Sequence, residues 1–166
     1  MIKNNLFFYL VISFVLLGCN SKKNENDRTR LAEMEEFTYK FSMESVGNYK
    51  VDFQLNPDST FQIEQQDYFF DRYAKKSSTN SRLGTLSSEE FAKFDKLIRE
   101  SDLYSLVDSY GFDENSDNSI VYLVELHSGD DVKYVSINVE TEHRFSNEFT
   151  ELIEFTTMFM NSKLVD

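Results

Sequence analysis

The sequence predicts an α+β domain in which an antiparallel sheet of about four to five strands carries two helices packed on one face. Three observations predict it. Apolar and polar residues alternate from residue 37 onward, turn residues separate such alternating segments, and two capped stretches show apolar residues at helical spacing. Short turns favour antiparallel pairing, and the helices then cover one face of the sheet. The predicted order is strand–hairpin–helix–hairpin–helix.

The first half of the domain has the period of half-buried strands. Residues 37–44 alternate strictly and predict the first strand. Residues 49–66 predict a hairpin around the turn at 56–59, where Pro fixes φ and Asp caps the chain locally. We expect the return strand to continue through residues 68–70, and a polar loop to follow at 74–81.

Capping residues place the two helices. Ser87 and Glu90 have the spacing of a capping box, which predicts a helix that begins there and ends near residue 101. Ser146 is the predicted N-cap of the last helix, which shows apolar residues along one face. Between the helices, residues 120–139 contain two alternating segments around a Gly turn and predict the second hairpin.

The first nineteen residues predict lipid attachment. Lys3 precedes an apolar run at 6–17, and Gly18 stands directly before Cys19, which is the only cysteine. A run of 12 residues is shorter than the roughly 20 that a spanning helix needs, and it is typical of a signal segment. We interpret residues 1–18 as a lipoprotein signal peptide, cleaved between Gly18 and Cys19, with acyl chains such as palmitate on Cys19.

The rest of the chain divides into a tether and one domain. Residues 19–36 are polar and predict a flexible tether, and residues 37–166 predict a single α+β domain. This organisation predicts a protein of the bacterial cell envelope, anchored by lipid to a membrane and placed on its periplasmic or surface face. The sequence leaves the choice of inner or outer membrane open.

The charge of the chain bears on its partners. Without residues 1–18 it has 16 basic and 29 acidic residues, a formal charge of −13. Such an acidic surface repels phosphate backbones, so we expect no nucleic-acid partner. No Gly-rich phosphate loop is present, and we expect no cofactor.

Several local motifs resemble those of a known group of proteins. They are a Tyr-x-Val-x-Phe strand at 49–53, an Asp-x-Thr turn at 58–60, a helix start at 84–90, and Leu-Tyr-Ser-Leu at 103–106 followed by Tyr110. On these motifs the chain from Tyr49 to about Met160 resembles an uncharacterised domain family of exported bacterial lipoproteins, with a ββαββα order. The resemblance implies a lipoprotein domain of the same fold. The same order of elements is similar to that of small inhibitors of thermolysin-type metalloproteases.

The densest aromatic cluster predicts a surface for a partner protein. Tyr68, Phe69, Arg72 and Tyr73 lie together in the sequence, and aromatic residues and Arg are favoured at interface hot spots. The alternative interpretation is strand core with one or two rings exposed.

One segment has part of the pattern of a calcium loop. Asp113, Asn115 and Asp117 have the oxygen spacing of liganding positions. Asn118 stands where such a loop needs Gly, and Val124 occupies the twelfth position, where Glu is needed. We therefore interpret the segment as a polar loop and predict no metal site, with calcium at these three residues as the alternative.

Residues with catalytic chemistry form no recognisable motif. His127 and His143 are the only histidines, and we predict that both are surface residues, His127 at a turn. No Gly-x-Ser-x-Gly elbow is present, and Glu89 and Glu90 are explained by helix capping. We predict no catalytic residue and a non-catalytic protein-interaction module. The alternatives are an envelope protease inhibitor and a hydrolase whose site has no local motif.

Overall fold

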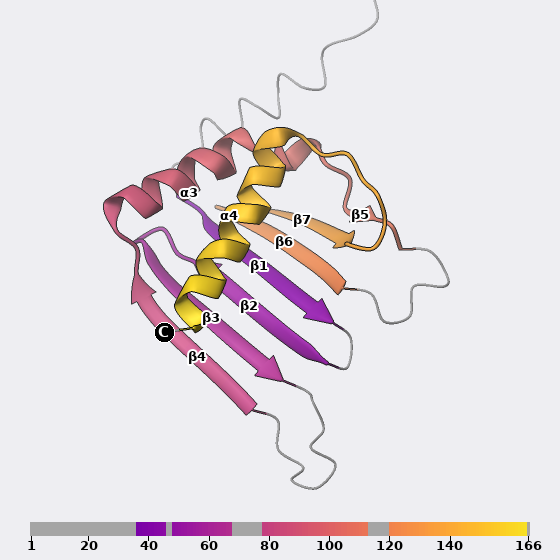
Figure 1. The fold of residues 1–166 in the computed structure, drawn as a ribbon. Helices are drawn as coiled ribbons and strands as arrows, with labels where there is room; N and C mark the ends of the chain where they lie inside the picture. Colours follow the sequence, from indigo (N-terminus) through magenta and orange to yellow (C-terminus); the bar gives the residue numbers. More distant parts are fainter. Residues whose placement is uncertain (1–35, 46–47, 68–77, 113–119, 166) are drawn as a thin grey trace, which may run out of the picture.

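One mixed sheet and two long helices make up most of the described chain, which in the computed structural model covers residues 36–45, 48–67, 78–112 and 120–165 (Figure 1). The sheet has seven strands in the order β4-β3-β2-β1-β6-β7-β5. In chain order these are β1 (Thr38–Ser45), β2 (Tyr49–Leu55), β3 (Thr60–Asp67), β4 (Ser78–Thr85), β5 (Ser109–Tyr110), β6 (Ile120–Ser128) and β7 (Asp131–Asn138).

Both long helices, α3 (Ser88–Glu100) and α4 (Asn147–Leu164), lie over the same face of the sheet (Figure 1). They share one core with it. The ring centroid of Phe53 in β2 lies 5.5 Å from that of Phe94 in α3 and 5.7 Å from that of Phe159 in α4. The predicted α+β class is confirmed. No helix within the described ranges is long and apolar enough to cross a membrane.

Two features of the predicted sheet are wrong. It has seven strands rather than four to five, because β4 and β5 were not predicted, and it is not wholly antiparallel. Strand β5 pairs in parallel with β7, with Ser109 opposite Ser136 and Tyr110 opposite Ile137. A strand of two residues is too short to show any period, so its presence depends on the neighbour with which it pairs.

A polar loop was predicted at 74–81. Residues 78–81 instead belong to strand β4, which begins at Ser78. It lies at the edge of the sheet and pairs with β3. On its core side Gly84 faces Phe61, whose ring would lie 2.7 Å from an added Cβ atom. Leu83 points to the opposite face and is 76% exposed. With Gly inside and Leu outside, β4 lacks the apolar alternation that identifies a strand.

The first predicted hairpin is confirmed as β2 and β3. At its turn the N–H of Asn56 donates to the carbonyl of Thr60 over 2.9 Å. The carboxylate of Asp58 accepts from the hydroxyl of Thr60 at 2.6 Å and from its backbone N–H at 3.0 Å. These bonds lower the pKa of Asp58 from its usual value. The predicted extension through residues 68–70 lies outside the described residues.

The second hairpin and the last helix are also confirmed. Strands β6 and β7 pair in antiparallel fashion, and Gly129 takes a positive φ of 56° in the turn between them. The side chain of Ser146 accepts from the N–H of Phe149 over 3.1 Å and so caps α4.

Helix α3 begins with the predicted capping box. The side chain of Ser87 accepts from the N–H of Glu90, and the Glu90 carboxylate accepts from the N–H of Ser87 over 2.8 Å. The backbone bond to Ser87 is the main cause that lowers the pKa of Glu90 from its usual value. The capping box therefore favours the ionised form of this glutamate.

Glu90→Gln is expected to lower the free energy of unfolding by about 0.3–1 kcal/mol at neutral pH, as is typical of an exposed carboxylate at a helix start. The folded-state pKa of Glu90 is depressed. Its contribution is therefore complete above the ordinary pKa of 4.5 and is lost as the pH falls through the folded-state value. Urea unfolding at several pH values measures the difference in free energy of unfolding between the wild type and Glu90→Gln. Glu89→Gln, in the same helical turn, reports the helix-dipole effect alone. A wild-type advantage over Glu90→Gln that is as large at about pH 3 as at pH 7 would contradict the assignment.

Candidate functional site

The residues that the sequence predicted for function lie outside the described part of the chain. They are the signal cleavage site at Gly18 and Cys19, the predicted partner-binding cluster of Tyr68, Phe69, Arg72 and Tyr73, and the calcium alternative at Asp113, Asn115 and Asp117. These assignments stay predictions. The structure instead directs attention to the segment that leads from β7 into α4.

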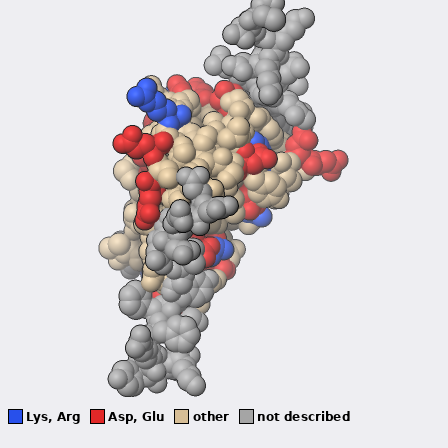
Figure 2. Space-filling view, turned by 90° about the vertical axis from the view of Figure 1, so that its right-hand side faces the viewer, with Lys and Arg blue, Asp and Glu red and all other residues tan. Residues whose placement is uncertain are grey.

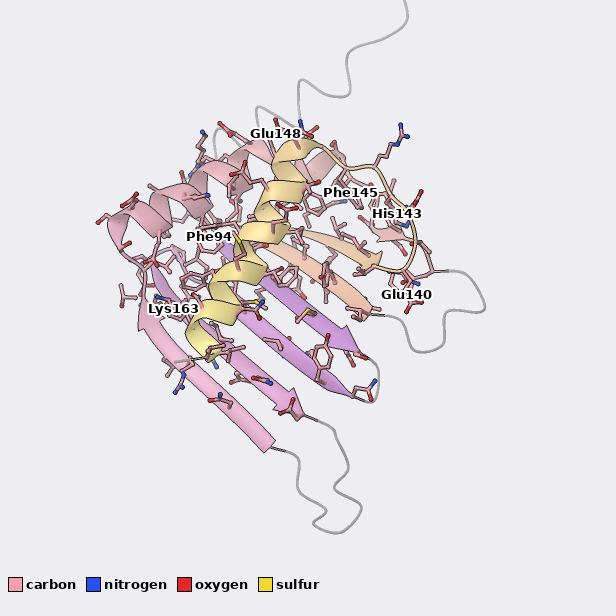
Figure 3. All side chains as sticks on the ribbon, viewed as in Figure 1. Phe94, Glu140, His143, Phe145, Glu148 and Lys163 are labelled. Carbon is pink, nitrogen blue, oxygen red and sulfur yellow. The ribbon has the colours of Figure 1, made fainter. Side chains whose placement is uncertain are left out.

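Four rings from three elements meet along this segment. Tyr110 comes from β5, His143 and Phe145 from the loop after β7, and Phe149 from the first turns of α4 (Figure 3). The Tyr110 ring lies 5.4 Å from His143 and 4.9 Å from Phe145, and Phe145 lies 5.1 Å from Phe149. All three pairs are close to edge-to-face, a favourable geometry for aromatic rings. This ring cluster holds the loop against the sheet.

Hydrogen bonds fix the orientation of His143. The hydroxyl of Thr141 lies 2.9 Å from the carbonyl of Asn138, which accepts from it. The same hydroxyl is hydrogen-bonded to Nε2 of His143 over 2.5 Å, with donor and acceptor set by the tautomer of the imidazole. The side chain of Asn138 donates in turn to the carbonyl of Gly111 at 3.0 Å. The polar groups of the loop are thus used to position it.

Gly111 makes this close approach possible. Its φ is +76°, and a Cβ atom there would lie 1.9 Å from the hydroxyl oxygen of Thr141 and 2.7 Å from Nε2 of His143. Two independent constraints, the left-handed backbone and the lack of space, therefore require glycine at this position.

A cavity of about 230 Å³ opens beside the ring cluster. We call it the loop pocket. Its wall is mostly apolar, and includes Tyr122, Ile137, Val139, Phe145, Phe149 and Ile153. Burial, and after it the nearby Tyr49 side chain, raises the pKa of Tyr122, so this phenol is neutral at physiological pH.

Acidic side chains are frequent on the loop and the helix start that contribute to the loop pocket. Residues 140–154 contain five glutamates and one arginine, all exposed. Glu154 lines the loop pocket itself, and Figure 3 shows Glu140 and Glu148 towards the two ends of the loop. Figure 2, which faces this side of the molecule, shows a broad area of uncharged side chains with Asp and Glu around it.

A second cavity, of about 360 Å³, lies on the sheet face opposite the helices. Ser42, Glu44, Lys50 and Leu123 contribute to its lining. Lys50 forms an ion pair with Asp52 at 2.9 Å, so part of its charge is already balanced. The lining of this depression mixes charged, polar and apolar side chains, among them Phe112 and Val121, whereas the wall of the loop pocket is mostly apolar and built from rings, and we therefore place the candidate site at the loop pocket.

The predicted turn position of His127 was wrong, whereas its side chain, 31% exposed, does lie at the surface. His127 lies within β6, not at a turn, and its Nε2 is 2.9 Å from Glu125. His143 is half-buried in the ring cluster instead of lying on the surface. The described residues contain no group of three His, Cys, Asp or Glu side chains suited to a metal ion.

No protein-family model matches this chain, and no curated protein matches it either. The resemblance to exported lipoprotein domains therefore stays a prediction from its motifs.

Proposed function

We propose that this chain is a lipid-anchored protein of the bacterial cell envelope and a member of the uncharacterised domain family that it resembles. The support is the N-terminal sequence, in which the apolar run ends at Gly18-Cys19. Acyl chains on Cys19 would hold the domain at a membrane, because each buried methylene contributes about 0.8 kcal/mol. Residues 19–36 would act as the tether, on the periplasmic or surface side.

The domain itself is, in this proposal, a non-catalytic protein-interaction module that binds its partner at the loop pocket. The observation that carries the proposal is an apolar, ring-lined cavity within an acidic surface. The chemistry of its polar residues favours binding over catalysis. The Thr141 hydroxyl is bonded both to the carbonyl of Asn138 and to Nε2 of His143, so these groups are engaged with one another and position the loop.

Photo-crosslinking on intact cells tests this function. A photo-reactive phenylalanine derivative in place of Val139, which lines the loop pocket, is expected to give a discrete adduct with one envelope protein. The same replacement at Val132 is the matched control, because the two valines are 41% and 42% exposed and Val132 lies on the opposite face of the sheet. Identical adduct patterns at the two positions would contradict a specific interaction at the loop pocket.

A fatty-acid probe added to the same cells tests the anchor. Wild-type protein is expected to take up the label, and Cys19→Ser is expected to remain unlabelled and to leave the membrane fraction. Unlabelled wild-type protein would overturn the anchored location without affecting the crosslinking result.

The edge strand β4 favours a second function, that of an envelope protease inhibitor. Described residues 79–83 and Thr85 of this strand are exposed, and within the described residues only β3 pairs with it. An extended strand with a free edge is the form in which a partner adds a strand of its own. A protease crosslinked from the same photo-reactive residue in place of Leu83, which is 76% exposed on β4, would support inhibition over the general interaction module.

A further inference from the structure

We propose that the loop pocket accepts one apolar side chain from a segment of a partner protein that carries lysine or arginine beside it. This inference rests on the proposed interaction function and names the chemistry of the partner. Three properties of the loop pocket lead to it: its volume, its mostly apolar wall and the acidic residues on the loop and helix that form it.

The small volume of the loop pocket favours a single side chain as its occupant over a free small molecule. Pockets for drug-sized ligands have volumes of roughly 300–1,000 Å³. The loop pocket, at about 230 Å³, is smaller and suits a single large apolar side chain. An isolated group of that size has little area for contact, so the remaining contacts must come from the chain that presents it.

The wall selects an apolar group. Ile137, Phe149 and Ile153 offer no hydrogen-bonding side-chain atoms. The hydroxyl of Thr141 and Nε2 of His143 are bonded to each other, and Tyr122 is neutral. Glu154 is the one carboxylate in the lining and is exposed, so it would meet a basic group of the same segment, whereas an aromatic or aliphatic tip would complete the ring cluster.

The acidic residues on the loop and at the start of α4 favour a partner segment that is basic. Glu140, Glu142, Glu148 and Glu154 are exposed on the loop and on the first turns of α4. Glu151 is partly balanced by Lys93, whose Nζ lies 3.7 Å from its carboxylate. The remaining carboxylates outnumber the single Arg144 and repel an acidic partner, whereas lysine or arginine next to the inserted side chain would meet opposite charge.

Isothermal titration of three short peptides into the full-length chain tests the inference. The protein is held in nanodiscs of zwitterionic lipid, and empty nanodiscs report binding to lipid. The first peptide has one Phe flanked by lysines, the second has the same Phe flanked by glutamates, and the third has Ala in place of Phe between lysines. The first is expected to bind at least about tenfold more tightly than either of the others, and added salt is expected to weaken it.

Two blocking variants locate the binding. Val139→Trp and Thr150→Trp both place a large ring at the loop pocket and are expected to weaken the first peptide at least about tenfold. Val132→Trp is expected to leave the affinity unchanged. Equal binding of the Phe and Ala peptides, or equal effects of Val139→Trp and Val132→Trp, would overturn the inference. Those results would leave the proposed interaction function standing if crosslinking from position 139 still gives a specific adduct.

Discussion

Phe94→Ala is expected to lower the free energy of unfolding by about 3–5 kcal/mol, the usual cost of removing a buried aromatic ring. Phe94 is 0% exposed and contacts rings from both layers of the domain. Its centroid lies 5.5 Å from Phe53, 4.7 Å from Phe155 and 5.6 Å from Phe159. Truncation at this position leaves a cavity between the sheet and both helices, which the surrounding rings are too rigid to fill.

Equilibrium unfolding in urea measures this loss. Domains of this size have total stabilities of roughly 5–15 kcal/mol, so the variant would lose a large share of its stability. Met158→Ala, in α4 and 63% exposed, is the control and is expected to change stability by less than about 0.5 kcal/mol. A loss below about 1 kcal/mol for Phe94→Ala would show that this ring is not central to the core.

Gly111→Ala is expected to lower the free energy of unfolding by about 2–5 kcal/mol, because it combines two unfavourable effects. A non-glycine residue at φ +76° costs roughly 1–2 kcal/mol, and overpacking adds about 1–3 kcal/mol. The added methyl group would displace Thr141 and His143, so the loop pocket is also expected to lose its shape. The same peptide titration would then show weaker binding.

Gly129→Ala separates these two effects. Gly129 also has a positive φ, of 56°, but a Cβ atom there meets nothing within 4 Å. Gly129→Ala is expected to lower the free energy of unfolding only by the cost of a non-glycine residue at positive φ, about 1–2 kcal/mol. Thermal and urea unfolding of both variants compare the costs. Equal losses for Gly111→Ala and Gly129→Ala would show that the contact of Gly111 with the loop contributes nothing.

The parts of the fold that the sequence predicted are those set by local chemistry. The capping box at Ser87, the turn at Asp58 and the Ser146 cap each depend on residues a few positions apart, and the structure contains all three. Strands β1 and β2 were predicted from their alternating apolar and polar residues, a pattern that arises whenever one face of a strand is buried. Such features can be predicted without knowledge of the partner strands.

The parts that the sequence did not predict depend on distant neighbours. Strand β4 is defined by its pairing with β3, and the two residues of β5 by their pairing with β7. The candidate site also depends on contacts between residues that are distant in the sequence. Tyr110 and His143 meet because β5 adds to the sheet beside β7, and no spacing along the chain indicates this contact. The one local signal was the group of three rings, His143, Phe145 and Phe149, around the Ser146 helix cap.

The position of β1 sets the order in which the molecule can assemble. Strand β1 pairs on one side with β2, which follows at once, and on the other with β6, so that Thr38 lies opposite His127. The hydroxyl of Tyr39 in the same strand bonds to Thr156, 117 residues later, at 3.1 Å. Contacts of such high sequence separation slow folding, since the chain must lose much entropy before they form. During synthesis the meander of β1 to β4 therefore emerges first with an open edge at β1, which stays open to wrong partners until β6 arrives.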